Sequence, residues 1–187
     1  MGMGDEVIAE FKGRIDKTID DLRRDLGKIR TGRANPGMLD SVTVDSYGTR
    51  VQLNAVATIS IPDARLIVIK PYDKSQIGAI EKALNEAQIG ITPQNDGTVI
   101  RLPVPPLTEE RRKEIAKQVK TRGEDHKVAV RNERRDANEM LKELEKDGEI
   151  SSDEEKRFLD AVQKETDGGI TRIDETVAKK QKEVMEI

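Results

Sequence analysis

The apolar residues of this chain follow two different periods, and the changes between them divide the sequence into three parts. Near the N-terminus they recur at alternating steps of three and four: Ile8, Phe11, Ile15, Ile19, Leu22, Leu26 and Ile29. This spacing is typical of a helix that packs along a narrow apolar seam. We expect one long helix ending near Arg30, because Gly32 permits backbone conformations closed to other residues and Pro36 disfavours helix just before it.

Between residues 38 and 106 the period becomes two, which is typical of strands. The strands predicted in this way cover residues 42–44, 51–53, 57–61, 66–69 and 99–102. The first two flank Tyr47-Gly48 and predict a β-hairpin. A short helix is predicted over residues 75–87, and Asn95-Asp96-Gly97 predicts a tight turn before the last strand. The middle of the chain therefore predicts a small β/α/β module.

The helical period returns twice after the proline-rich stretch that ends at Pro106. One helix is predicted from Thr108 to about Leu144, and another follows Asp147-Gly148-Glu149, where either Ser151 or Ser152 fits a capping box. Gly168-Gly169 is expected to weaken the middle of that last helix.

None of these helices can bury its apolar seam alone, so we expect the first to pack with the last two. The resulting fold is α+β: an elongated three-helix bundle, residues 1–31 and 106–187, carrying an inserted β/α/β domain at 32–105. Two chain crossings join the parts and would permit a hinge in an angular molecule. The first hinge strand comprises Thr31, Gly32 and Arg33, and the second comprises Pro103, Val104, Pro105 and Pro106.

Charge is distributed unevenly along the chain. The net formal charge is −3, yet residues 101–135 carry 11 Lys and Arg against 6 Asp and Glu, whereas residues 136–187 carry 9 against 16. On a helix, steps of three and four from Lys113 place a row of cations on one face, nearly opposite the seam of Ile115 and Val119. That row comprises Lys113, Lys117, Lys120, Lys127, Arg131, Arg134 and Arg135.

A cationic row of this length suits a phosphate backbone better than a single carboxylate, so we interpret the chain as an RNA-binding protein. Its few aromatic residues are scattered in sequence, which favours structured RNA recognised through phosphates and shape over stacked single-stranded bases. One alternative stays open: the seams could form a coiled-coil adaptor or homodimer whose basic face pairs with an acidic protein. A monomer in solution would favour the first interpretation, and a stable dimer the second.

Several other classes of function lack support in the sequence. The chain has no cysteine and one histidine, His126, which excludes thiolate and two-histidine metal sites. His126 lies near the predicted seam, where packing is expected. No nucleophile motif or converging acid pair is present, so we expect neither an enzyme nor a cofactor. No apolar run has membrane-spanning length and no secretory signal opens the chain, so we expect a cytoplasmic protein.

Three stretches together resemble the signature motifs of the bacterial ribosome recycling factor family. They are Lys28-Ile-Arg-Thr-Gly-Arg-Ala-Asn-Pro36, Pro105-Pro-Leu-Thr-Glu-Glu-Arg-Arg-Lys113 and Val128-Ala-Val-Arg-Asn-Glu-Arg-Arg-Asp-Ala-Asn138. The resemblance implies an L-shaped, non-catalytic protein that disassembles the post-termination ribosome with elongation factor G and GTP, releasing mRNA and tRNA for a new round of translation. It implies that Arg131 contacts large-subunit ribosomal RNA at the subunit interface, with Arg134 and Arg135 as basic neighbours. Glu133 places an acid inside this arginine motif.

Overall fold

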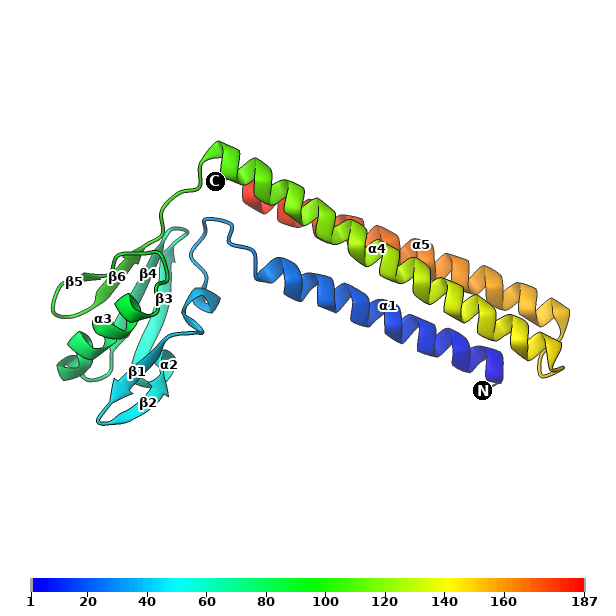
Figure 1. Ribbon diagram of the computed structural model, residues 1–187, viewed down its shortest axis with the longest axis horizontal. Coiled ribbons are helices and arrows are strands. Elements are labelled where there is room, and N and C mark those ends of the chain that lie inside the picture. The colour runs from blue at the N-terminus through cyan, green and yellow to red at the C-terminus, as the bar shows by residue number, and fades with distance from the viewer. Residues whose placement is uncertain (1, 187) are drawn as a thin grey trace. The chain divides into compact units, whose positions relative to one another are not determined.

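The computed structural model describes residues 2–186 and divides into two compact units (Figure 1). The helical unit comprises residues 2–30 and 109–186, and the second unit comprises residues 31–108. The three long helices are α1 (Met3–Gly27), α4 (Glu109–Lys146) and α5 (Ser152–Met185). Since the α/β unit enters the sequence between α1 and α4, it is an insertion in a three-helix bundle. This confirms the predicted α+β class.

The bundle core consists of the predicted apolar seams. Each long helix packs against the other two. The buried residues of α1 include Phe11, Ile15, Ile19, Leu22 and Leu26, and those of α4 and α5 include Ile115, Val119, Val130, Leu141, Val162 and Ile173. The first helix ends at Gly27, slightly before the predicted end at Arg30. Among the described residues, no helix combines the length and apolar character needed to cross a bilayer.

Glycine allows the helices of the bundle to approach closely at three places. A methyl group built on Gly169 would lie 2.9 Å from Cγ2 of Ile15. On Gly4 or Gly123 it would overlap Phe158 or Val177. Gly168, by contrast, faces open space, and α5 runs through both of its glycines without a break. The double glycine therefore does not interrupt α5, and Gly169 leaves room for Ile15 of α1.

The start of α5 confirms one of the two predicted capping boxes. The Ser151 hydroxyl accepts a hydrogen bond from the Glu154 amide at 3.2 Å, and the Ser151 amide donates to Glu154 Oε2 at 2.8 Å. The backbone hydrogen bond from Ser151 holds the pKa of Glu154 below its ordinary value. The turn before this cap contains Gly148, whose φ of 76° lies in the left-handed region.

The α/β unit contains a hairpin and a four-stranded sheet, both antiparallel. The hairpin pairs β1 (Thr43–Ser46) with β2 (Thr49–Gln52), as predicted. The sheet has the order β3-β4-β6-β5, built from β3 (Ala57–Asp63), β4 (Leu66–Pro71), β5 (Gln94–Asn95) and β6 (Ile100–Pro103). Its helices are α3 (Ile77–Glu86), the single turn α2 (Leu53–Val56) and the 3-10 turns η1 (Pro36–Leu39) and η2 (Lys74–Gln76).

The sheet has one buried face and one face with exposed polar residues. In β4, Ile67 and Ile69 are fully buried in a core that includes Ile80 and Leu84 of α3, whereas Lys70 is exposed. This alternation is the expected pattern for a sheet covered by a helix on one side. Leu53 belongs to α2 and not to the second strand of the hairpin as predicted; its side chain is buried in the same core.

Candidate nucleic-acid interface

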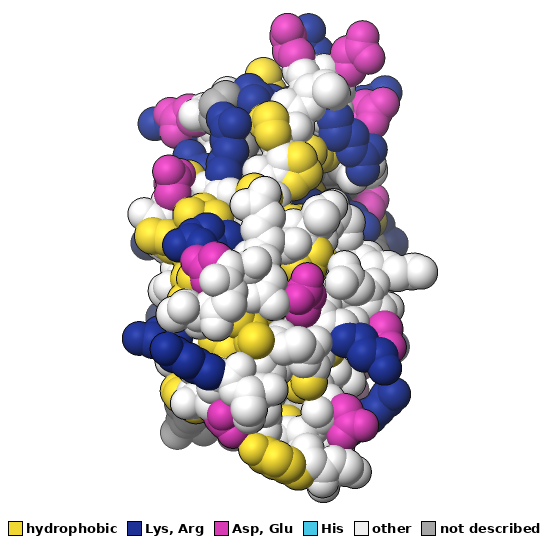
Figure 2. Space-filling view, turned by 90° about the vertical axis from the view of Figure 1, so that its left-hand side faces the viewer, with side chains coloured by type: hydrophobic (Ala, Val, Ile, Leu, Met, Phe, Trp, Pro, Cys, Tyr) yellow, Lys and Arg dark blue, Asp and Glu magenta, His cyan; other side chains and the backbone are white. Residues whose placement is uncertain are grey.

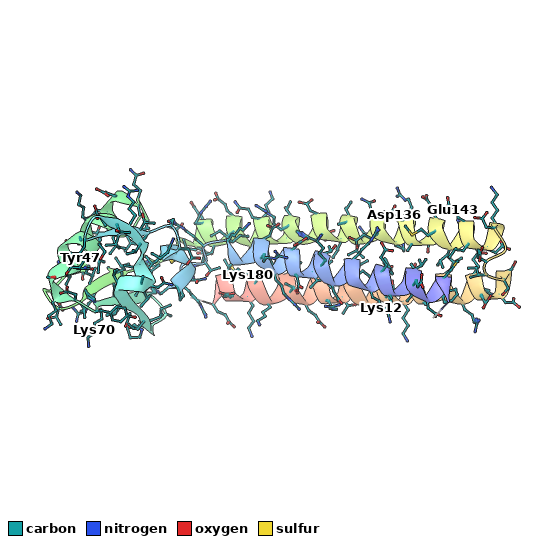
Figure 3. The ribbon with its side chains drawn as sticks, turned by 90° about the horizontal axis from the view of Figure 1, so that it is seen from below. Lys12, Tyr47, Lys70, Asp136, Glu143 and Lys180 are labelled. Carbon is teal, nitrogen blue, oxygen red and sulfur yellow. The ribbon has the colours of Figure 1, made fainter. Side chains whose placement is uncertain are left out.

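The basic residues of α4 are spread over the faces of the helix that lie away from its buried seam. The seam passes through Ile115, Val119, Gly123, Val130 and Ala137, all buried. At about 100° per residue, the predicted cations lie about 60–160° around the helix from this seam, with Lys117 and Arg135 farthest from it and Arg134 nearest. The cations nearer the seam contact α5: Lys127 pairs with Asp174, and Arg134 donates to Gln163. The predicted placement nearly opposite the seam fits Lys117 and Arg135 best, and charged side chains project along the whole bundle (Figure 3).

Two of the predicted cations are neutralised within the bundle. Lys127 Nζ lies 2.5 Å from Asp174 Oδ1 of α5 and 3.2 Å from Glu124 Oε1. The Lys127 side chain is only 14% exposed, and its hydrogen bond to Asp174 raises its pKa. Lys113 Nζ lies 3.0 Å from Glu109 Oε1. These two side chains offer a phosphate less attraction than sequence position suggests.

Four of the predicted cations are exposed and free of internal partners. Among residues 2–186, no hydrogen bond or ion pair engages the side chains of Lys117, Lys120, Arg131 or Arg135. We call these four residues the free cation row. Their positions span about 27 Å along α4, in two pairs separated by the neutralised Lys127. Arg134 is intermediate: it is partly buried and donates to the neutral amide oxygen of Gln163 at 3.3 Å.

The acid inside the arginine motif is turned away from this row. Glu133 Oε1 accepts a hydrogen bond from Thr18 Oγ1 of α1 at 2.8 Å. Its Oε2 is buried and has no hydrogen-bond partner among the described residues. Since the carboxylate points between α1 and α4, Glu133 does not share the surface of Arg131 and Arg135. A helical projection could have found this, because Glu133 continues the seam spacing from Val130.

His126 has the packing role expected from the sequence. Its side chain is 16% exposed, its Nδ1 donates to the carbonyl oxygen of Arg122 at 2.7 Å, and its Nε2 lies 3.9 Å from Asp25 Oδ2. Arg122 also pairs with Asp25, at 3.4 Å. Within residues 2–186, no three His, Asp or Glu side chains lie close enough to hold a metal ion.

A groove of about 390 Å³ lies between α4 and α5 beside the free cation row. Its lining includes Lys120, Gly123, Glu124, Lys127, Asp174 and Gln181. Cations and carboxylates alternate here and are largely paired with one another. The groove therefore lacks the convergent polar groups of a catalytic or small-molecule site.

The two predicted hinge strands are only partly separate from the α/β unit. Pro103 is the last residue of β6, opposite Leu66, and the buried Val104 donates its amide to the carbonyl oxygen of Arg65 at 2.8 Å. In the other strand Thr31 and Gly32 are buried, and Gly32 has a φ of 76°. The exposed residues of the two strands are Arg33, Pro103, Pro105 and Pro106, and of these only Pro103 is paired in the sheet.

Comparison with known proteins identifies the family. The model of the ribosome recycling factor family matches residues 22–185. The chain is 59% identical over 185 residues to the ribosome-recycling factor of Myxococcus xanthus and 55% identical to that of Geobacillus kaustophilus; each match covers 99% of this chain and the whole of the relative.

Solved structures agree with the sequence comparison. A solution structure of the ribosome recycling factor superposes with a TM-score of 0.75 at 36% identity, over the whole of both chains. A T. thermophilus ribosome recycling factor, from models of that factor and E. coli elongation factor G bound to the E. coli post-termination complex, superposes with a TM-score of 0.62 at 39% identity. That match covers 99% of this chain and all of the other. The chain therefore belongs to the ribosome recycling factor family.

Proposed function

We propose that this protein binds the post-termination ribosome and, with elongation factor G and GTP, promotes its disassembly into subunits and the release of mRNA and tRNA. Family membership supports this, as does the similar chain from T. thermophilus, which is described together with E. coli elongation factor G bound to the E. coli post-termination complex. The protein works in the cytoplasm as a monomer. It performs no bond chemistry itself, and GTP is hydrolysed by its partner.

The observation that carries the RNA contact is the free cation row on α4. A phosphate that approaches Arg131 or Arg135 displaces only water and counterions, because neither side chain has an internal ion pair among the described residues. At Lys127 the same phosphate would compete with Asp174 and Glu124. We therefore rank Lys117, Lys120, Arg131 and Arg135 as the primary contacts with large-subunit ribosomal RNA, Arg134 next, and Lys113 and Lys127 last.

Co-sedimentation with ribosomes over a series of salt concentrations tests this ranking. Arg131→Ala and Arg135→Ala should each weaken binding and reduce the dependence of log K on log salt by about 0.9 per lost phosphate contact. Arg122→Ala is the matched control, since Arg122 lies on the same helix but is paired with Asp25. Melting temperatures of the three variants show whether folding is intact. Equal binding losses in Arg131→Ala and Arg122→Ala would refute the assignment.

Subunit splitting is tested separately, by light scattering of post-termination ribosomes mixed with the protein, elongation factor G and GTP. A fall in scattering that requires all three components is expected. In this proposal, the hinge consists of Gly32-Arg33 and Pro105-Pro106, since Pro103 and Val104 are fixed to the sheet. Deleting Pro105 should spare ribosome binding and slow splitting. Splitting at the unchanged rate would remove the hinge from the mechanism.

A further inference from the structure

Tyr47 is an exposed aromatic residue at a backbone position that suits a different side chain. It forms the two-residue loop of the β1–β2 hairpin with Gly48, and both residues have positive φ, 51° and 82°. Loops of this type favour Asn-Gly, because a bulky side chain is strained in the left-handed region. The Tyr47 side chain is nevertheless 82% exposed. Neither turn formation nor core packing explains an aromatic ring here.

The fold holds this ring beside the segment that carries the only other tyrosine of the chain. Tyr47 Oη donates to Asp73 Oδ2 at 2.8 Å, and Gln76 Nε2 donates to Ser46 Oγ at 2.9 Å. These bonds attach the hairpin loop to the turn after β4. Tyr72, next to Asp73, is 69% exposed. The loop that carries Tyr47 is thus bonded to the residue next to Tyr72, and we call these two exposed tyrosines, with the lysines near Tyr72 in sequence, the tyrosine patch.

The patch includes two lysines, while its nearest carboxylate is already engaged. Lys70 and Lys74 are exposed, and within residues 2–186 neither side chain has an ion pair or hydrogen bond. Lys70 and Tyr47 are marked in Figure 3. Asp73 accepts hydrogen bonds from Ser75 and Tyr47, which hold its pKa below the ordinary value, Ser75 having the larger effect. The hairpin loop and the segment 70–74 bonded to it therefore carry two exposed rings and two free positive charges.

We infer that the tyrosine patch, Tyr47 and Tyr72 with Lys70 and Lys74, binds a single-stranded segment of RNA by stacking on its bases and pairing with its phosphates. A protein partner fits less well, because the core of a protein interface needs contiguous apolar area. The two tyrosines are the only large hydrophobic side chains classed as exposed among the described residues of the α/β unit. The face seen in Figure 2 likewise shows hydrophobic side chains interspersed with charged ones. Binding of a single-stranded RNA segment, by contrast, needs only an exposed ring on which a base can stack and a nearby cation that pairs with a phosphate.

The inference rests on the proposed ribosomal function, which supplies the RNA. The binding test described next does not depend on that function. The chain has two tyrosines and no tryptophan, so intrinsic tyrosine emission reports on this patch alone. Full-length protein is titrated with a single-stranded RNA twelve-mer and, as the control, with the same sequence in a duplex. We expect the single strand to quench the emission and the duplex, whose bases are stacked inside the helix, to leave it nearly unchanged. Equal quenching by both, or by neither, would overturn the inference.

Two substitutions at Tyr47 separate the ring from the turn. Tyr47→Asn suits the left-handed backbone, so it should fold at least as stably, yet it should weaken single-strand binding at least about fivefold. Tyr47→Phe keeps the ring and loses only the bond to Asp73, so its affinity should stay close to that of the unchanged protein. Unchanged RNA affinity in Tyr47→Asn, with or without weaker binding of elongation factor G, would refute the RNA assignment. Arg131→Ala should weaken ribosome binding without changing the quenching, which distinguishes failure of the patch from failure of the proposed function.

Discussion

The neighbouring glycines in the middle of α5 allow a direct test of how the bundle packs. In a helix interior, replacing glycine by alanine stabilises the helix by about 0.8–1 kcal/mol. At Gly168 the new methyl group meets open space, so the whole gain should appear in the free energy of unfolding. At Gly169 it would lie 2.9 Å from Ile15 Cγ2. Because overpacking a core costs about 1–3 kcal/mol, Gly169→Ala should range from neutral to about 2 kcal/mol destabilised.

Urea and thermal unfolding followed by far-UV circular dichroism measure this difference, with each variant compared to the unchanged protein. For a chain of this size, 1 kcal/mol shifts the melting temperature by about 2–4 °C. Gly168→Ala should melt higher and Gly169→Ala lower or unchanged. Gly123→Ala should be the least stable of the three, because its methyl group would overlap Val177, whose β-branched side chain has little rotamer freedom in a helix. Equal stabilisation by Gly168→Ala and Gly169→Ala would refute the close approach of α1 and α5.

Three further perturbations have defined outcomes. Asp96 accepts hydrogen bonds that lower its pKa to about 2, and the bond from the Val99 amide has the largest effect. The Asp96 carboxylate therefore stabilises the fold above its ordinary pKa of 3.8, and this stability is lost as the pH falls through about 2. Unfolding titrations should show a shallower acid dependence in Asp96→Asn. Ser151→Ala should lower the free energy of unfolding by about 1 kcal/mol in urea titrations, because it removes the cap of α5. Thr18→Val should lower the free energy of unfolding by about 1–3 kcal/mol in the same assay, because Glu133 loses its hydroxyl donor. If the buried charge of Glu133 is the cause, adding Glu133→Gln to this variant should recover part of the lost stability.

The apolar periods of the sequence predict most of the fold, because each element buries the face that carries its apolar repeat. Phe11 and Ile15 repeat at helical spacing, and Ile67 and Ile69 alternate at strand spacing; all four are buried. The single turn α2 was not predicted, since Leu53 continues the alternation of the hairpin and only tertiary packing makes it helical. The local pattern of apolar residues was therefore sufficient to predict those helices and strands that bury one face.

The sequence predicts which residue types form the candidate interface, but not which of its cations are paired with carboxylates in the folded protein. Helical spacing grouped Lys127 with Arg131, yet Lys127 is neutralised by Asp174, which lies 47 positions away on α5. That pairing depends on how the two helices align, which spacing on α4 alone does not contain. Tyr47 and Tyr72 were interpreted as scattered because the bond between Tyr47 and Asp73 exists only in the folded hairpin.

The three close glycine contacts have a mechanical consequence. Each involves α5: Phe158 sits over Gly4, Gly169 receives Ile15, and Val177 sits over Gly123, so the contacts are spread over about 28 Å of that helix. If one helix moved along another by one turn, the side chain packed over a glycine would instead meet a residue that has a side chain, and the two would overlap. The bundle therefore resists sliding of its helices along the bundle axis. A force applied at one end of the bundle is transmitted to the other end without the helices moving past one another.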